Sequence, residues 1–410
     1  MFLKLNGLLH FVPVNHIVTH LLSIRWSVKF QECDGLMEGS NKSVELSQTC
    51  NLPPEIINEI LLRLPVQSLL KFKCVSKSWL ILISSSEFIK THVSISRKPN
   101  NYSNYTVILA SHAVPITYYT CSLSSILSNT VMDNSRVLEF PMSDLDFQLW
   151  FVGSCNGLLC VSIDPTTLVL YNPSIRKLKP LPISGTDTGN SSYISYGFCF
   201  DELCDDFKVV ELNIVLDRAF MYSTGVKVYS LRNDSWRKFG NDHEGRICSS
   251  GGQSVGGILH WRISMIDGRY LIFAVNTVTN IYDTLAAPPT LDKQDVVAEW
   301  SLGELNGCLA VFRDYYNIRL DVWAMKEYGV KESWSKVVSI PYPVNPSGHL
   351  WPLFVLQNAE IFLDYGPYLM LYNSGNNSFT TREIHSIGGL CSVAAPAYIE
   401  SLVTPTFVQE

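Results

Sequence analysis

The sequence has few charges and no basic cluster. Of its 410 residues only 17% are charged, and the formal net charge is -6. A protein that binds nucleic acid needs clustered Lys and Arg to neutralise the phosphate backbone, and the sequence holds no such block. Direct nucleic-acid binding is therefore disfavoured.

Long apolar runs are also absent. No clean stretch of 18 apolar residues is available to span a bilayer, so stable membrane insertion is not expected. The apolar leader at residues 1–36 is broken by residues such as Asn6, Pro13 and His16, and it lacks a clear small-residue cleavage pattern. We hypothesise that translation begins at Met37, and we treat residues 1–45 as a poorly defined leader.

Patterns that hold metals, phosphates or cofactors are missing. Eleven cysteines, an odd number at irregular spacings, indicate reduced thiols in the cytoplasm or nucleus rather than a disulfide framework. The closest pairs, Cys155 with Cys160 and Cys199 with Cys204, have no matching histidine pair, so buried free thiols are favoured over zinc. The sequence therefore predicts no metal site and no cofactor.

Two short patterns imitate functional motifs. Residues 252–256 (GQSVG) spell the nucleophile elbow of hydrolases, which would make Ser254 a nucleophile. The elbow needs a helix after the serine, whereas the segment that follows, GILHWRI, is typical of a strand. We therefore expect a turn and no catalytic residue. A hydrolase that uses Ser254 stays an alternative.

Four acidic residues lack calcium-loop spacing and predict a solvated turn: Asp201, Glu202, Asp205 and Asp206.

One segment, at residues 51–92, has apolar residues at helical spacing. Pro53 and Pro54 can begin a helix, because a missing amide donor costs little there. Pro65 ends this helix and can begin a second one, and Ser76 is suited to cap a third. Helices this short cannot bury all their apolar surface among themselves, so they pack either on a partner or on the rest of the chain.

The run LPPEIINEILLRLPVQSLLKFKCVSKSWLILI within this segment closely resembles the F-box. The resemblance covers the Leu-Pro start, the Leu64-Pro65 break and the CVSKSW segment in order, with a lysine at Lys77 where the family often has arginine. It implies an F-box at residues 46–92 that docks on a small Skp-family adaptor, and through it on a cullin and a RING subunit. Carried over position by position, the adaptor-binding residues would be Leu52, Pro53, Ile56, Ile60, Leu64, Pro65, Leu69, Val75 and Trp79.

From residue 105 onward the sequence is typical of short strands joined by turns. A five-residue pattern recurs about every 50 residues, as LVLYN (168–172), VKVYS (226–230), IFAVN (272–276), LDVWA (320–324) and LMLYN (369–373). Gly-led apolar strands such as GLLCV and GCLAV precede most copies. The period predicts a β-propeller-like ring of about five or six blades, closed by a strand near residues 106–110 against the C-terminal strand. A large β-sandwich would give the same signals.

Most of residues 150–385 resemble the F-box-associated domain of plant F-box proteins. The segments that carry this resemblance are GSCNGLLCVSIDPTTLVLYNPSIRKLKPLP, YGFCFDELCDDFKVVEL and VKVYSLRNDSWRKF. We therefore expect an α+β multidomain protein, in which a small three-helix F-box precedes an all-β, β-propeller-like substrate-recognition domain at residues 93–404.

Together the two resemblances imply a substrate-recruiting subunit of an SCF-type cullin ubiquitin ligase. Such a subunit has no catalytic residues of its own, works in the cytoplasm or nucleus, and binds a protein target through loops at one end of its ring. Tyr118, Tyr119, Tyr315 and Tyr316 are either loop contacts or packed strand ends. The alternative is a non-ligase β-propeller scaffold that binds proteins without supporting ubiquitination.

Overall fold

The computed structural model describes residues 2–5, 8–11, 52–97, 104–111, 116–128, 135–141, 148–186, 192–216, 222–240, 242–289, 299–315, 318–343, 349–356, 360–365, 368–383 and 391–406. The chain divides into two compact units, residues 1–85 and residues 86–410. Most of the leader, Met37 included, lies outside the described residues, and the hypothesis of a start at Met37 stays a prediction. Within the leader, β1 (Phe2–Leu5) pairs with β2 (Leu8–Phe11) in antiparallel fashion.

The first unit contains three short helices after the leader: α2 (Pro54–Leu61), α3 (Val66–Phe72) and α4 (Lys77–Ser84). Pro53 is the N-cap of α2 and Pro65 is the N-cap of α3. The Ser76 hydroxyl caps α4, because it accepts a hydrogen bond from the backbone amide of Trp79 at 3.2 Å. All three predicted helix starts are confirmed. No helix in the described part of the chain is both long and apolar enough to cross a membrane.

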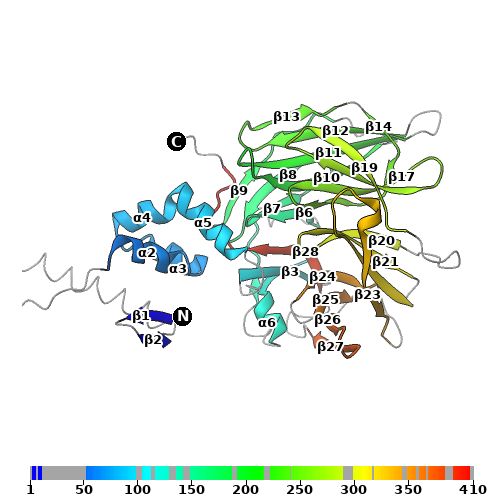
Figure 1. Ribbon diagram of the computed structural model, residues 1–410. Coiled ribbons are helices and arrows are strands. Elements are labelled where there is room, and N and C mark those ends of the chain that lie inside the picture. The colour runs from blue at the N-terminus through cyan, green and yellow to red at the C-terminus, as the bar shows by residue number, and fades with distance from the viewer. Residues whose placement is uncertain are drawn as a thin grey trace, which may run out of the picture. The chain divides into compact units, whose positions relative to one another are not determined.

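The second unit begins with helix α5 (Ser86–Ser96) and continues as β-sheets (Figure 1). Among the described residues these comprise four separate four-stranded sheets and one ten-stranded sheet. The separate sheets are β28-β3-β4-β5, β6-β7-β8-β9, β20-β21-β22-β23 and β24-β25-β26-β27. The ten-stranded sheet contains two further four-stranded units, β10 to β13 and β16 to β19, with β14 and β15 off the main path.

The strands of these units are β28 (Cys391–Ile399), β3 (Tyr105–Ser111), β4 (Tyr118–Ser122), β5 (Arg136–Val137), β6 (Trp150–Cys155), β7 (Leu158–Ser162), β8 (Leu168–Asn172), β9 (Lys177–Pro180), β10 (Ser192–Asp201), β11 (Asp206–Leu216), β12 (Tyr222–Ser230), β13 (Ser235–Lys238), β14 (His243–Glu244), β15 (Arg246–Ile247), β16 (Gly251–Val255), β17 (Ile258–Ser264), β18 (Tyr270–Asn276), β19 (Ile281–Ala286), β20 (Glu299–Leu305), β21 (Cys308–Asp314), β22 (Arg319–Met325), β23 (Trp334–Pro341), β24 (Trp351–Val355), β25 (Glu360–Tyr365), β26 (Tyr368–Asn373) and β27 (Ser378–Glu383). Two short helices interrupt them, α6 (Leu123–Leu127) and η2 (Lys331–Ser333).

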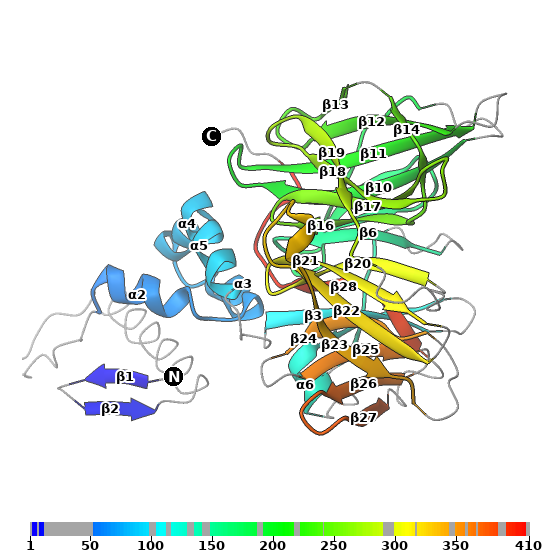
Figure 2. The same ribbon diagram turned by 45° about the vertical axis from the view of Figure 1, so that its right-hand side comes forward.

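The units form a propeller-like ring that the C-terminal strand closes. Strand β28 pairs antiparallel with β3, with Cys391 opposite Ser111 and Ile399 opposite Tyr105. The two strands lie side by side in both ribbon views (Figures 1 and 2). The predicted closure is therefore confirmed. A sandwich would instead pair the sheets face to face, whereas here each four-stranded unit follows the one before it along the chain.

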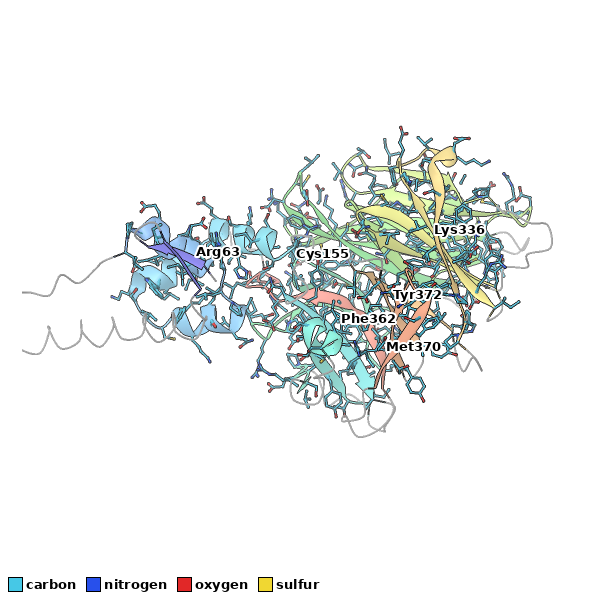
Figure 3. All side chains as sticks on the ribbon, turned by 60° about the horizontal axis from the view of Figure 1, so that its bottom comes forward. Arg63, Cys155, Lys336, Phe362, Met370 and Tyr372 are labelled. Carbon is cyan, nitrogen blue, oxygen red and sulfur yellow. The ribbon has the colours of Figure 1, made fainter. Side chains whose placement is uncertain are left out.

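The recurring five-residue pattern is the third strand of its unit in all five copies. In β26, Leu369 and Leu371 pack into one apolar cluster, while Met370 and Tyr372 pack into the cluster on the opposite face of the sheet (Figure 3). Successive strand residues point to opposite faces, so a strand buried on both faces is apolar throughout. This explains why the pattern does not alternate between apolar and polar residues.

Tight turns join the first and second strands of several units. Asn156-Gly157 and Asn306-Gly307 each place two successive residues at positive φ, and Gly256-Gly257 does the same. Such turns match the twist of a two-stranded hairpin and favour Asn-Gly or Gly-Gly. The Gly-led strands expected from the sequence are therefore the second strands, β7, β17 and β21.

A tryptophan spans the join within the ten-stranded sheet. Strands β10 and β16 pair in parallel at Gly197 with Gly252. A Cβ atom at either glycine would lie within 2.7 Å of the Trp261 ring. The Trp261 indole N–H donates to the Ser195 hydroxyl at 3.1 Å. The two glycines thus leave room for the buried ring beside both first strands, β10 and β16.

Candidate interaction surfaces

The nine residues predicted to bind an adaptor divide by exposure. Leu52, Pro53, Ile56 and Pro65 are exposed, and Val75 and Trp79 are partly exposed. The remaining three are buried at 5% exposure or less: Ile60, Leu64 and Leu69. The buried residues cannot touch a partner in this arrangement and act as core, so they would support an adaptor surface through the helices that they hold. The adaptor role itself stays a prediction for all nine.

Two exposed apolar residues of α4 were missed in the sequence. Leu80 is 46% exposed and Ile81 is 71% exposed, beside Leu52 at 37% and Ile56 at 42%. Their signal was present, because Leu80-Ile81-Leu82-Ile83 is an apolar run longer than one face of a helix can bury. We name Leu52, which directly precedes the N-cap of α2, and Ile56, Leu80 and Ile81 the exposed helical residues. Neighbouring Trp79 is fixed edge-on against Phe72, with 5.5 Å between ring centroids.

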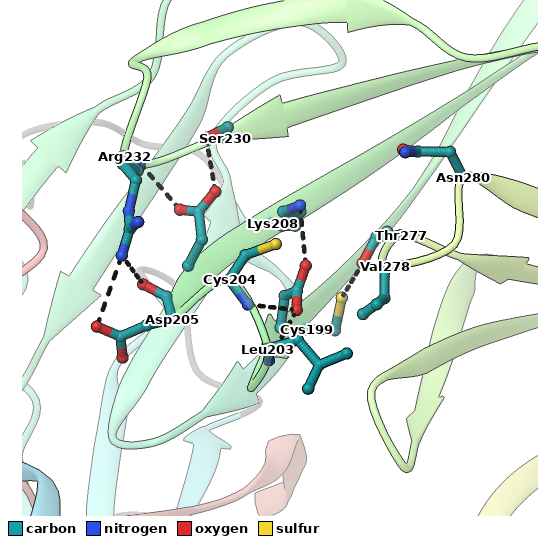
Figure 4. Close-up of polar contacts among 12 residues, drawn as sticks. Cys199, Leu203, Cys204, Asp205, Lys208, Ser230, Arg232, Thr277, Val278 and Asn280 are labelled. Atoms are coloured by element: carbon teal, nitrogen blue, oxygen red, sulfur yellow. Dashed lines mark hydrogen bonds and ion pairs between the residues drawn. The ribbon is translucent and has the colours of Figure 1, made fainter.

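The acidic segment between β10 and β11 is a turn, as predicted, but half of it is buried. Asp201 is fully buried, pairs with Lys208 at 3.0 Å and accepts the backbone amides of Leu203 and Cys204 (Figure 4). These bonds hold the pKa of its carboxyl below the ordinary value in spite of burial. Asp206 is also buried and accepts the Ser230 hydroxyl at 2.6 Å. The expectation of a fully solvated turn is corrected, because backbone donors need these two carboxylates.

The other two acidic residues of this turn hold helix α5. Asp205 pairs with Lys90 at 2.7 Å, and Glu202 pairs with Arg97, directly after the helix, at 3.4 Å. Lys90 and Arg97 are seven residues apart, so they lie on one side of the helix. The carboxylates that the sequence left without a role therefore pair with α5 and the residue after it, within the second unit.

Exposed apolar side chains gather at one end of the ring. In each unit the first strand starts at this end, and the connections from second to third strands lie there too; we call it the loop end. The exposed residues at these strand starts and connections are Ile116, Trp150, Tyr193, Ile266, Tyr270, Ile318, Trp351 and Tyr368. Large exposed aromatics are frequent anchors of protein interfaces. The loop end is the candidate surface for a protein target.

The four tyrosines singled out in the sequence are not these anchors. Tyr118 is buried, and its hydroxyl accepts the backbone amide of Leu149 at 2.9 Å. Tyr315 is 5% exposed and lies under the Arg319 guanidinium. Tyr119 is partly exposed within β4, and Tyr316 lies outside the described residues. Of the two alternatives, loop contacts or packed strand ends, the second is confirmed for Tyr118 and Tyr315.

Buried titratable groups in the ring are held neutral by their surroundings. Burial lowers the pKa of His260 to about 4 and raises the pKa of the Cys199 thiol to about 12. His260 also lies 2.9 Å from the Tyr328 hydroxyl. A thiol with so high a pKa is a poor nucleophile at neutral pH. Cys160 and Cys199 are buried thiols as predicted, whereas Cys155 is partly exposed and Cys204 is exposed, which differs from the expectation.

Ser254 lies in a strand–turn–strand segment. It belongs to β16, and the Gly256-Gly257 turn leads directly into β17. A nucleophile elbow places the serine on a sharp turn between a strand and a helix. The prediction of a turn followed by a strand, made from the residues after Ser254, is therefore confirmed.

Comparison with known families agrees with this architecture. The sequence profile of the "F-box domain" matches residues 49–91, and that of the "F-box associated beta propeller domain" matches residues 105–397, which is more than half of the chain. The chain is an F-box protein. It belongs to the family in which an F-box precedes an F-box-associated propeller domain, and both resemblances seen in the sequence are confirmed.

Several plant F-box proteins are similar to this one along most of its length. F-box/kelch-repeat protein At3g23880 of Arabidopsis thaliana is 31% identical over 88% of this chain and 98% of its own. F-box protein CPR1 of the same plant is 30% identical over 71% of this chain and 73% of its own. Among solved structures, TolB from Acinetobacter baumannii has a TM-score of 0.44 at 10% identity, over 79% of this F-box protein and 72% of TolB.

Proposed function

We propose that this F-box protein recruits a protein target to an SCF-type cullin ubiquitin ligase in the cytoplasm or nucleus. In this proposal the helical unit binds a Skp-family adaptor, which links the protein to the cullin and RING subunits. The loop end of the ring holds the target. In this role the protein needs no catalytic residue, metal or cofactor of its own, and it accelerates ubiquitin transfer by raising the local concentration of the target.

The observation that carries the proposal is the order of two modules with exposed apolar surfaces. An F-box domain precedes a propeller domain, and the exposed helical residues Leu52, Ile56, Leu80 and Ile81 remain accessible in the described chain. Short helices that leave Ile and Leu in water gain stability when a partner covers them. An adaptor with an apolar binding surface fits that requirement.

The test compares adaptor binding by the full-length protein and by an Ile56→Arg, Ile81→Arg variant. Both isoleucines are exposed, so arginine replaces them without disturbing the core. Burial of one such side chain contributes roughly 1.5–3 kcal/mol, so the double variant should bind recombinant Skp-family adaptor at least about 100-fold more weakly in biolayer interferometry. Ile183→Arg is the matched control, since Ile183 is 74% exposed and Ile81 is 71% exposed. It should bind like the wild type.

Affinity purification from cells then separates the ligase from its alternative. Recovery of adaptor, cullin and RING subunit with the wild type, and their loss in the double variant, is the expected result. Adaptor without cullin would indicate a non-ligase scaffold. Adaptor binding that survives both arginines would contradict the proposed surface. Labelling of the protein by a serine-directed phosphonate would revive the hydrolase alternative at Ser254.

A further inference from the structure

A shallow hollow lies at the loop end, where the unit of β20 to β23 meets the unit of β24 to β27. Its floor is apolar and consists of Phe312, Leu320 and Leu350, which belong to the core between the two units. Trp300 and Trp351, near the starts of β20 and β24, also line it, and Trp351 is 43% exposed. An exposed tryptophan beside an apolar floor favours a ligand with an aliphatic part.

The polar lining of the hollow is mainly acidic. Glu299 is exposed at the start of β20 and forms no ion pair with another described residue. Asp314 is 6% exposed and accepts the Tyr342 hydroxyl at 2.7 Å and the His349 ring at 2.8 Å. Because Asp314 already has these donors, Glu299 is the carboxylate that an incoming cation would meet.

The neighbouring cations are already engaged. Arg313 donates to the carbonyls of Pro288 and Pro289 and lies over the Trp323 ring. Arg262 donates to the Trp300 carbonyl at 2.8 Å, and Arg319 lies 3.5 Å from buried Asp321. Among the described residues that line the hollow, Glu299 is therefore the charged side chain without an ion-pair partner.

The size of the hollow restricts the cation. Its enclosed part has room for about one water-sized group. An ammonium group is of that size, whereas a planar guanidinium is larger. A lysine side chain also supplies a four-carbon stem that can lie against exposed Trp351 outside the enclosed part, and a tryptophan face attracts the ammonium.

We propose that this hollow binds one lysine side chain of an extended segment in the protein target. The ammonium of the lysine enters the hollow and pairs with Glu299, and its stem lies against Trp351. This inference rests on the proposed function, because it identifies part of the surface through which the target is recognised.

The probe is a random dodecapeptide phage library selected on the full-length protein. Enriched peptides should share a lysine at one position. The strongest is then synthesised with lysine, arginine or norleucine at that position, and binding is measured to the wild type, Glu299→Gln, Trp351→Ala and Glu332→Gln. Glu332 is an exposed carboxylate at the opposite end of the same unit and serves as the matched control. Thermal unfolding of each variant verifies that it is folded.

We expect Glu299→Gln to weaken the lysine peptide about fivefold, near the upper limit for an exposed ion pair, and Trp351→Ala to weaken it about threefold. Glu332→Gln should have no effect, and Glu299→Gln should leave binding of the norleucine peptide unchanged, because that peptide lacks the ammonium. Selection of no peptide, of acidic peptides, or of a lysine peptide indifferent to Glu299 would overturn the proposal. A preference for arginine would overturn the size argument. Adaptor binding by the same preparations is measured separately, so failure of the hollow and failure of the ligase proposal give different results.

Discussion

The clasp between Asn172 and the C-terminal tail allows a quantitative prediction about ring closure. Asn172 is the last residue of β8 and is fully buried. Its side-chain amide nitrogen lies 3.1 Å from the Ser401 carbonyl and 2.7 Å from the Val403 carbonyl, and its oxygen accepts the Ser174 amide at 2.9 Å. The tail that follows closing strand β28 is thus bound to a second unit of the ring.

Asn172→Ala should lower the free energy of unfolding by about 4 kcal/mol, because the buried Ser401 carbonyl, the part-buried Val403 carbonyl and the buried Ser174 amide lose their partner at roughly 1–3 kcal/mol each, reduced where water enters the space. In a chain that ends at residue 400, two of the three partners are already missing. The same substitution should then cost only about 1–2 kcal/mol. The coupling between substitution and truncation is therefore expected to be about 2–3 kcal/mol.

The assay is urea unfolding followed by tryptophan fluorescence for the four proteins of this double-mutant cycle. Asn373 provides the control, because it ends the equivalent strand β26 and accepts the Gly375 amide at 2.9 Å without contacting the tail in any bond that the structure describes. Asn373→Ala should be additive with the truncation. If Asn172→Ala is additive as well, the clasp does not contribute to closure and the reasoning fails.

Three further predictions concern groups buried in the ring. The pKa of His260 is lowered to about 4, so as the pH falls the unfolded chain binds a proton at this histidine before the folded chain does. The stability that neutral His260 contributes is therefore complete above pH 6.5 and should fall by about 3 kcal/mol as the pH drops toward 4. Thermal unfolding measured against pH should show that His260→Gln removes this loss. Burial raises the pKa of Asp364 to about 7, so the stability contributed by its protonated form is complete below the ordinary carboxyl pKa and declines as the pH rises. Asp364→Asn should therefore raise the thermal unfolding midpoint more at pH 8 than at pH 5. A difference that does not depend on pH would refute this prediction. Gly252→Ala places a Cβ 2.4 Å from the Trp261 ring, whereas Gly251→Ala meets nothing closer than 3.6 Å; calorimetry should show the first substitution to be destabilising by about 1–3 kcal/mol and the second to be nearly neutral.

Local chemistry made much of the helical unit predictable. The starts at Pro53, Pro65 and Ser76 follow from residues next to each other in the chain, and the structure confirms them. Spacing alone did not show which face of each helix is buried. The sequence pattern does not distinguish buried Ile60, Leu64 and Leu69 from exposed Ile56. Apolar residues at helical spacing can form either the core or a surface that binds a partner.

The candidate surface at the loop end was less predictable. Tyr118 and Tyr315 stood out as aromatic residues near strand ends, yet both are buried. Trp351 and Glu299, which line the hollow, begin strands that follow segments with no distinctive pattern. Their juxtaposition joins residues 52 positions apart in the sequence and requires two units of the ring to meet. No periodicity within either segment could indicate that contact.

The sequence by itself determined the family, the helix starts, the period of the ring and the position of its closing strand. Each of these is written in short segments: a capping residue, a proline, an Asn-Gly turn or a third strand apolar on both faces. Only the tertiary structure decided that Asn172 binds the tail, that the acidic turn pairs with Lys90 of α5 and with Arg97 directly after it, and which aromatics remain exposed. These features join residues far apart in the chain, and their pairing depends on how the closed ring brings separate segments together.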